Sequence, residues 1–332
     1  MINYLDVFIT VIFLLLLAVP GFIFAKTKAF PETASETLSV IVLYGCQPIL
    51  IITSFQGCSF SKDILLNILI VALLALFIHL VMFAIVKLLF LKRQDEDKIK
   101  IVKYLSTFSN CGFMGLPFLQ SLFTDASLQS ELMIYCAVII AVFNILNWTF
   151  GVYILTGDKK QISFKKVIIN PVIIAVIISL VLFFSVQKPL VELYPDGTIA
   201  NKIFSKLMNS LNFLSNAVTP LSMFVIGIKL SNIKFTKMVT EKWAYLSTFL
   251  KLVVMSIVTT LTVAFLPIPA TIKYTLFFLL SMPSATSGAM MSVKYGKDGE
   301  FASVGVVLST VCSIVTLPLL YLFMNTVLGV SL

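Results

Sequence analysis

Two short runs of small and polar residues interrupt otherwise apolar segments, and they hold the side chains best suited to contact a ligand. The first run is SNCGFMGLP at residues 109–117, and the second is SMPSATSG at residues 281–288. Proline removes a backbone donor and glycine weakens a helix, so each run predicts a broken helix. A break exposes the N-terminus of a half-helix, whose free N–H groups and positive dipole end attract an anion.

The polar side chains placed near the middle of apolar segments are neutral. They are Gln47, Ser109, Asn110, Asn144, Ser281, Ser284 and Thr286. The acidic residues lie at segment ends or in connections, so no carboxylate pair is available for a proton antiporter. Neutral donors beside helix N-termini suit a carboxylate ligand better than a cation. We therefore expect an anion site and no metal site.

Two ionisable residues, His79 and Lys251, lie inside apolar segments. His79 has no acidic partner at its depth, so a hydrogen bond to a neighbouring helix is favoured over a role as a proton relay. Lys251 lies on the cytoplasmic half of its segment. We expect its ammonium to extend to the interface rather than to contact the substrate.

The composition predicts the elements that carry these residues. The 332 residues are 59% hydrophobic and 12% charged, with a mean hydropathy of +1.04. Soluble proteins carry about 25% charged residues, so this surface must face lipid. About 20 apolar residues cross a bilayer as a helix. Ten segments meet this length: 4–25, 35–55, 64–90, 102–123, 131–156, 167–187, 203–229, 243–266, 271–293 and 301–327. The chain is thus predicted to be an all-α polytopic membrane protein.

The basic residues predict the orientation of these ten segments. Eighteen lie in or near the connections after odd-numbered segments: Lys26, Lys28, Lys87, Lys92, Arg93, Lys98, Lys100, Lys103, Lys159, Lys160, Lys165, Lys166, Lys229, Lys234, Lys237, Lys242, Lys294 and Lys297. The opposite connections hold Lys62, Lys188, Lys202, Lys206 and Lys273. Cytoplasmic loops are enriched in Lys and Arg, so both termini are expected to be extracytoplasmic in a cell membrane. The net charge of +9 is then a signal of topology, and no nucleic-acid partner is implied.

The two interrupted segments are the fourth and the ninth, five segments apart. A repeat of five helices must place its second copy upside down in the membrane. Weaker matches at the same spacing pair Gln47-Pro48 with Thr219-Pro220. Paired interrupted helices in matching halves indicate an inverted-repeat transporter with its site near the midplane. We expect one repeat over 1–156 and the inverted repeat over 167–332.

The run at 109–118, SNCGFMGLPF, resembles a signature of the auxin efflux carrier family, in its prokaryotic malate-permease-like branch, and STVCSIVTLP at 309–318 resembles the family's last helix. The resemblance implies two inverted five-helix repeats with broken, crossing helices four and nine, similar to sodium–proton antiporters and bile-acid transporters. It also implies a scaffold (1–55 plus 167–229) that forms a homodimer. A transport domain (64–156 plus 243–327) would move against this scaffold like an elevator.

By the same resemblance, Asn110 and Pro117 in the first run and Pro283 in the second are residues of the crossing. Gly112 in the first run joins them among the expected substrate-binding residues. The function implied is a permease or efflux carrier for a small mono- or dicarboxylate, in contact with the lipid bilayer. The connection at 157–166 is too short for the large loop of the plant auxin carriers, which puts auxin itself in doubt. The alternatives are a sodium-coupled carrier of larger amphipathic anions and an anion-binding receptor that does not transport. With one histidine and no HExxH motif, neither an enzyme nor a cofactor is expected.

Overall fold

A computed structural model describes residues 4–93, 96–233 and 235–328 of the chain. The predicted cytoplasmic residue Lys234 lies outside these ranges. So do residues 1–3, 94 and 95 of the first predicted repeat and residues 329–332 of the second. The described residues form helices joined by short connections, and the only β-type pairing among them is one isolated bridge between Ser109 and Ser284.

Eight helical stretches of the described chain are long and apolar enough to cross a membrane. They are Tyr4–Lys26, Ala34–Phe55, Lys62–Leu89, Leu128–Thr156, Pro171–Leu193, Ile199–Ser231, Lys242–Ala264 and Gly299–Val327. Each overlaps one of the ten segments expected from the sequence, with ends that agree to within a few residues. The protein is therefore all-helical and passes the membrane several times, as its composition predicts.

The other two expected segments are broken at the runs identified in the sequence. Helix α5 (Asp97–Thr107) stops before Phe108, and the chain resumes as a π-helical turn (Cys111–Gly115) followed by α6 (Leu116–Leu122). Helix α16 (Ala270–Ser281) is likewise separated from α17 (Ser287–Lys294) by residues 282–286. Pro117 is the second residue of α6 and lies six residues after the helical backbone resumes at Cys111.

The remaining helices are connected by short loops. Their bounds are α1 (Tyr4–Lys26), α2 (Ala34–Val40), α3 (Gln47–Phe55), α4 (Lys62–Leu89), α7 (Ala126–Leu146), α8 (Val152–Thr156), α9 (Phe164–Ile168), α10 (Pro171–Val186), α11 (Ile199–Asn216), α12 (Val218–Ser231), α13 (Phe235–Thr240), α14 (Lys242–Phe249), α15 (Met255–Ala264) and α18 (Gly299–Leu328). Three further π-helical turns join neighbouring helices: Ile41–Cys46, Asn147–Gly151 and Leu250–Val254. Such turns occur often at functional sites.

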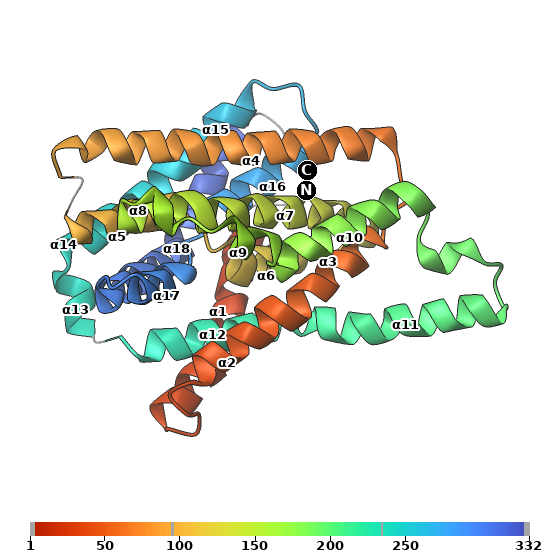
Figure 1. Ribbon diagram of the computed structural model, residues 1–332, viewed down its shortest axis with the longest axis horizontal. Helices are drawn as coiled ribbons and strands as arrows, with labels where there is room; N and C mark the ends of the chain where they lie inside the picture. The colour runs from red at the N-terminus through yellow and green to blue at the C-terminus, as the bar shows by residue number, and fades with distance from the viewer. Residues whose placement is uncertain (1–3, 94–95, 234, 329–332) are drawn as a thin grey trace.

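The helices pack in two groups. One group joins α1, α2, α3, α10, α11 and α12 through mutual contacts, and the other joins α4, α5, α7, α14, α15, α16 and α18. The two groups also contact each other, through α1 with α18 and through α3 and α10 with α7. In Figure 1, α4 runs along one side of the molecule, and α11 and α12 lie on the opposite side. The broken helices lie between these sides, where the two groups meet.

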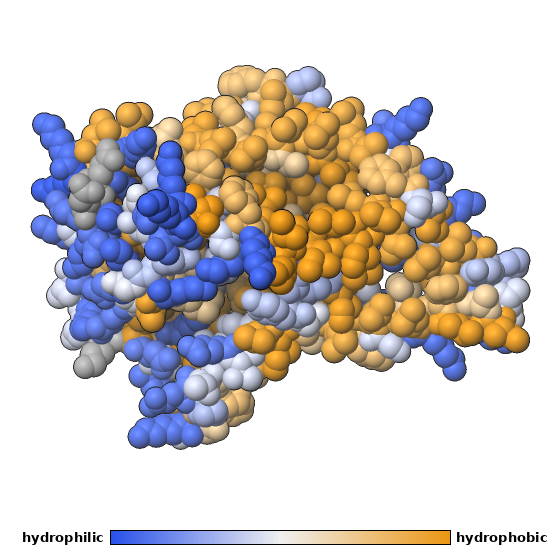
Figure 2. Space-filling model, viewed as in Figure 1, coloured by the Kyte–Doolittle hydropathy of each residue, from blue (hydrophilic) through white to orange (hydrophobic). Residues whose placement is uncertain are grey.

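The long helices of the described chain run roughly side by side in Figure 1, with the connections gathered at two ends. Figure 2 shows hydrophilic residues concentrated towards the left and lower left, and a broad hydrophobic face across the middle. Exposed leucine, isoleucine and phenylalanine side chains are numerous on α1, α4 and α10. A surface of this kind faces lipid rather than water.

Helices α1 and α12 approach each other closely because glycine lies on both sides of the contact. A Cβ atom placed on Gly227 would lie 1.9 Å from the carbonyl oxygen of Ala18, and one on Gly21 would lie 2.4 Å from that of Phe224. Small residues permit this kind of backbone contact between membrane helices. The contact fixes α1 against α12 within the first group.

Candidate functional site

The two breaks are joined by a reciprocal pair of backbone hydrogen bonds. The N–H of Asn110 donates to the carbonyl oxygen of Pro283 at 2.8 Å, and the N–H of Ala285 donates to that of Phe108 at 2.9 Å. Non-helical backbone inside a membrane protein is stable only where other groups satisfy its donors and acceptors. Each break therefore supplies the partners that the other one lacks.

Two serines complete this exchange between the breaks. The Ser109 hydroxyl donates to the carbonyl oxygen of Leu280 at 2.8 Å, and the Ser284 hydroxyl donates to that of Leu105 at 2.9 Å. Both carbonyls lie in the last turn of a half-helix, where no intrahelical donor remains. The backbone N–H of Ser284 also donates to the Ser309 hydroxyl at 3.0 Å. Serine at 109 and 284 thus closes the C-terminal end of the opposite half-helix.

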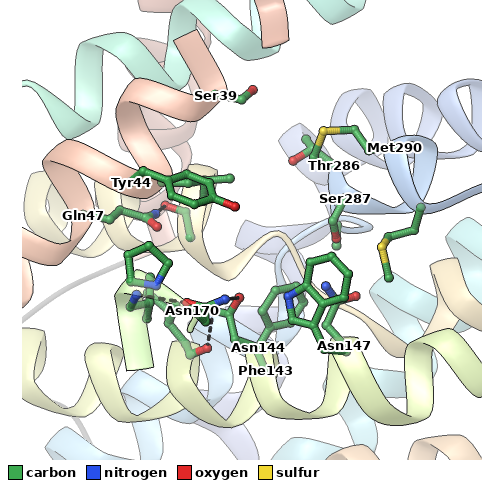
Figure 3. A pocket seen from close by; sticks show the side chains of 18 of the residues that line it. Ser39, Tyr44, Gln47, Phe143, Asn144, Asn147, Asn170, Thr286, Ser287 and Met290 are labelled. Carbon is green, nitrogen blue, oxygen red and sulfur yellow. Dashed lines mark hydrogen bonds between the residues drawn. The ribbon is translucent and has the colours of Figure 1, made fainter. Parts of the chain in front are cut away.

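A cavity of about 710 Å³ opens beside this crossing. Figure 3 shows three of its walls: Tyr44 and Gln47 on one side, Asn144 and Asn147 on a second, and Thr286, Ser287 and Met290 on a third. The first wall comes from the turn Ile41–Cys46 and the start of α3, and the second from the end of α7 and the turn Asn147–Gly151. The third comes from the start of α17 and the residue before it. The cavity therefore lies where both packing groups and both breaks meet.

Six of the ten site residues expected from the sequence line this cavity: Gln47, Ser109, Asn110, Gly112, Asn144 and Thr286. The other four, Pro117, Ser281, Pro283 and Ser284, are not among its lining residues. Ser284 turns its hydroxyl to α5, and Pro283 offers its carbonyl to Asn110. Pro117 and Ser281 are buried within half-helices. These four positions build the crossing rather than the wall of the cavity.

Asn110 and Gln47 bring polar groups without partners to the cavity. Asn110 is 3% exposed and Gln47 is 1% exposed. The Nδ2 donor of Asn110 and the Oε1 acceptor of Gln47 have no hydrogen-bond partner within the described parts of the chain. A buried polar group left unpaired destabilises the fold by about 1–3 kcal/mol. A ligand that bonds to these amides would remove that penalty.

Through its amide nitrogen, Gln47 connects the start of α3 to the first break. Its Nε2 donates to the carbonyl oxygen of Gly112 at 2.9 Å. A Cβ atom on Gly112 would lie 2.9 Å from the same Nε2 atom, closer than side chains normally approach. Glycine at position 112 therefore leaves room for Gln47 against the first break.

A second set of amides stiffens the opposite wall. Asn170 donates from Nδ2 to the Oδ1 atom of Asn144 at 3.0 Å, and its own Oδ1 caps α10 by accepting the N–H of Val172 at 2.9 Å. Asn144 in turn donates to the carbonyl oxygen of Ile140 at 2.8 Å. Figure 3 shows Asn144 and Asn170 in contact at the edge of the cavity. These hydrogen bonds hold α7 against the start of α10.

The buried Tyr104 hydroxyl connects two further wall residues. It donates to Oδ1 of Asn147 and lies 3.0 Å from the Ser287 hydroxyl. Asn147 belongs to the π-helical turn after α7, and Ser287 is the first residue of α17. Tyr104 on α5 therefore positions one residue from each of two cavity walls.

The remaining wall is aromatic and basic. Three lysines, Lys165, Lys166 and Lys294, and one acidic residue, Glu36, line the cavity. The ammonium groups of Lys166 and Lys294 lie 5.5 Å and 4.8 Å from the ring centroid of Trp148. This excess of positive charge favours an anion at the cavity. Tyr44, Phe113 and Phe143 add aromatic surface for an apolar part of the ligand.

Sequence reasoning missed this basic and aromatic wall. Lys165, Lys166 and Lys294 were counted as determinants of membrane orientation, and the same residues also line the cavity. Trp148 carried a signal, because tryptophan is rare in this chain and lies one residue from Asn147. No pattern in the sequence places residues 148, 166 and 294 together, since the tertiary packing alone brings them close.

The structure corrects the expectation for Lys251. Its side chain is fully buried, with 0% exposure, and does not extend to the membrane interface. The Nζ atom donates to the carbonyl oxygen of Leu280 at 2.7 Å and to the Ser109 hydroxyl at 2.5 Å. The position in the segment was compatible with snorkelling, but the helix is rotated so that this side chain points at the crossing.

The expected partner of His79 is also corrected. Its Nδ1 atom lies 2.7 Å from the carbonyl oxygen of Ala75, four residues earlier on the same helix α4 rather than on a neighbouring helix. The Nε2 atom has no hydrogen-bond partner within the described ranges. His79 is not among the residues that line the cavity.

Comparison with known proteins gives a family match along the chain. A family model described as "Membrane transport protein" matches residues 6–164 and 159–321. A protein from Methanocaldococcus jannaschii, named as an uncharacterized transporter, is 26% identical over 321 residues, which cover 95% of this chain and 97% of the relative. The two family matches together include both breaks and every residue of the cavity wall named above.

Proposed function

Because this chain belongs to the membrane transport protein family, the family of the auxin efflux carriers, we propose that it is a secondary transporter for a small organic anion such as a mono- or dicarboxylate. The observation that carries the proposal is a cavity lined by three lysines and one acidic residue, with Asn110 in its wall, whose buried Nδ2 donor has no partner among the described residues. A carboxylate oxygen accepts from such an amide, and the lysines attract its charge.

The half-helices support an anion at the same place. Asn110 precedes the π-helical turn that leads into α6, and Thr286 precedes α17, so both half-helix N-termini begin at cavity residues. The first N–H groups of a helix have no intrahelical acceptor and carry the positive end of its dipole. In transporters with discontinuous helices, such ends point at anionic groups of the substrate.

We propose ten membrane crossings arranged as two inverted five-helix repeats, 1–156 and 167–332. The eight long helices and the two broken segments, five apart in order, support this arrangement. With Lys165, Lys166 and Lys294 on the cytoplasmic side, the cavity opens inwards and both termini are extracytoplasmic in the cell membrane. The two packing groups correspond to a scaffold (1–55 plus 167–229) and a transport domain (64–156 plus 243–327).

The mechanism that we propose is elevator-type alternating access. The cavity is lined from both packing groups, and Gln47 of the proposed scaffold contacts Gly112 of the proposed transport domain. Movement of the transport domain along a scaffold that dimerises would carry the anion with the crossing. The anion would stay bound to Asn110 and to the half-helix ends while access changes from one side of the membrane to the other.

A larger amphipathic anion is the second candidate substrate. The cavity of about 710 Å³ and its aromatic residues, among them Tyr44, Phe143 and Trp148, favour a ligand with a sizeable apolar body. This substrate class would be carried with sodium in transporters of the bile-acid type. Substrate size and sodium dependence therefore separate the two candidates in one assay.

The test is transport by reconstituted protein. Malate, malonate, lactate, indole-acetate and taurocholate would be applied to protein on a solid-supported membrane, with and without sodium and with a pH step, and isotope uptake would be measured in parallel. We expect current or uptake for one class of anion, and its loss in Asn110→Ala without loss of folded protein. Asn209→Ala, which removes an exposed amide on α11, is the matched control.

Unchanged uptake by Asn110→Ala would contradict the assignment of this residue to the substrate site. Saturable binding without uptake or current would instead indicate a receptor. Uptake that requires sodium and prefers taurocholate would favour the second candidate substrate over the first.

A further inference from the structure

Lys251 places its amino group at the crossing without lining the cavity. It lies in the π-helical turn between α14 and α15, inside the apolar stretch Lys242–Ala264, and its side chain is fully buried. Its two hydrogen-bond acceptors are the carbonyl oxygen of Leu280 at 2.7 Å and the hydroxyl of Ser109 at 2.5 Å. Leu280 lies in the last turn before one break and Ser109 lies in the other, so one side chain connects both.

The site around this ammonium is built as a site for a cation. Both partners are oxygen atoms, one from a carbonyl and one from a hydroxyl. Leu280 lies in the last turn of α16, and Ser109 follows the end of α5 by two residues. The negative dipole end of α16 therefore faces Lys251, and the Ser109 hydroxyl just beyond α5 supplies the second oxygen. In broken-helix transporters, carbonyls at such half-helix C-termini coordinate sodium.

We propose that Lys251 is a built-in cation of the crossing, which occupies the oxygen-lined position where a soluble sodium ion would otherwise bind. Transport of the anion is then independent of sodium. This inference rests on the proposed transport function and selects between its two candidates. Lys251 is a positioning residue, because it reaches the cavity only through Ser109 and the adjacent Asn110.

The contacts explain why a tethered charge suits this position. The Ser109 hydroxyl accepts a hydrogen bond from the Lys251 ammonium and donates one to the carbonyl oxygen of Leu280, so two hydrogen bonds fix its geometry. Asn110, the next residue, is bonded through its backbone to Pro283. A lysine in place of an exchangeable ion keeps this arrangement in every step of the cycle. The charge is never released to solvent, and no ion gradient is needed to assemble the anion site.

The experiment measures sodium directly and does not depend on knowing the substrate. Purified full-length protein would be tested for binding of radioactive sodium and for thermal stability in sodium and in choline chloride. Three variants would be compared with the native protein: Lys251→Ser, which empties the position and leaves its oxygen ligands; Lys251→Met, which fills it without charge; and Lys273→Ser, a control at another buried lysine, on α16.

We expect the native protein and Lys273→Ser to bind no sodium and to have the same unfolding temperature in both salts. Lys251→Ser should bind about one sodium ion per chain and become more stable in sodium, while Lys251→Met should do neither. Stoichiometric sodium binding by the native protein would overturn the proposal, and so would folded Lys251→Ser that binds none. If Lys251→Ser does not fold, sodium binding by the native protein can still overturn the proposal.

Uptake separates this inference from the proposed function. Equal uptake of an anion by native protein in sodium and in choline supports both, and uptake that requires sodium contradicts the built-in cation alone. No uptake of any anion in either salt contradicts the transport function. The sodium-binding and stability measurements would then still test the role of Lys251.

Discussion

At the scale of single residues, the cavity depends on side chains that hold others in place. Tyr104 is the clearest case, because its hydroxyl contacts both Asn147 and Ser287 from beneath the cavity wall. We predict that Tyr104→Phe lowers the free energy of unfolding by about 1–3 kcal/mol, since it leaves buried polar groups without a partner. The thermal unfolding temperature in detergent measures this loss. The KM of uptake should rise, because two wall residues lose their positions.

The control for this prediction is Tyr153→Phe on α8, which removes a hydroxyl that does not line the cavity. We expect it to unfold and transport like the native protein. An unchanged KM in Tyr104→Phe, together with normal stability, would show that Asn147 and Ser287 do not need the tyrosine to form the wall.

Residue types could be predicted from the sequence better than residue directions. Asn110 stood out because a polar amide beside glycine in an apolar segment has few roles other than contact with a ligand or a break. Lys251 was misread because depth along a helix follows from the sequence, whereas rotation about the helix axis follows from packing. The carbonyl oxygen of Leu280 accepts a hydrogen bond from Lys251. It lies 29 residues away in the sequence and becomes available only because α16 stops there.

At the scale of elements, the broken helices were foreseeable and their pairing was not. Proline and glycine predicted an interruption in each segment. In the first segment the non-helical residues 108–110 lie just before the glycines and the proline, and in the second the non-helical residues 282–286 lie within the predicted run. The bonds that join the breaks connect residues more than 170 positions apart, such as Ser109 with Leu280 and Ser284 with Leu105. The sequences of the two segments do not indicate which of their backbone groups will meet. The hydrogen bonds between the breaks are therefore seen only in the folded structure.

Alanine substitutions at two glycines should change stability in opposite directions, one in the contact of α1 with α12 and one outside it. Alanine at Gly227 would place its Cβ atom 1.9 Å from the Ala18 carbonyl oxygen, and the helices would have to separate. We predict that Gly227→Ala destabilises the protein by about 1–3 kcal/mol. Gly45→Ala adds the same atom where no other atom lies within 4 Å. It should be neutral or stabilising by up to about 1 kcal/mol, because alanine is the better helix former.

Thermal unfolding of the two variants, side by side in the same detergent, measures this difference. Equal unfolding temperatures would mean that the close approach of α1 and α12 does not limit stability. Transport by Gly45→Ala should remain normal, which also shows that the substitution leaves the neighbouring cavity residues Tyr44 and Gln47 in place.

At the scale of the whole molecule, composition predicted the environment and the basic residues predicted an orientation, because both depend on counts over long segments. The division into two packing groups was implied by family resemblance rather than by any residue pattern. Within this division α1 packs on α12 and α4 packs on α7, while contacts of α1 with α18 and of α3 with α7 join the two groups. The division into a scaffold and a transport domain is therefore a proposal.

The elevator proposal predicts that a link between the groups stops transport and a link within one group does not. Between the groups, the Thr219 hydroxyl on α12 donates to Oε1 of Gln120 on α6 at 2.9 Å. Within the proposed transport domain, the Thr271 hydroxyl on α16 donates to Oε1 of Glu131 on α7 at 3.2 Å. Cysteine pairs at 120/219 and at 131/271 would be joined by a short bifunctional thiol reagent, in a chain whose five native cysteines have been replaced.

We expect uptake to be lost when the 120/219 pair is linked and to return when a reductant cleaves the link, because the bond ties the moving body to the scaffold. The 131/271 pair has the same kind of contact and should tolerate the link, since both residues would travel together. Single-cysteine variants treated with the reagent control for its attachment. If transport continues with 120/219 fully linked, α6 and α12 keep their contact throughout the cycle, and access must alternate by local opening at the cavity rather than by movement of the two groups past each other.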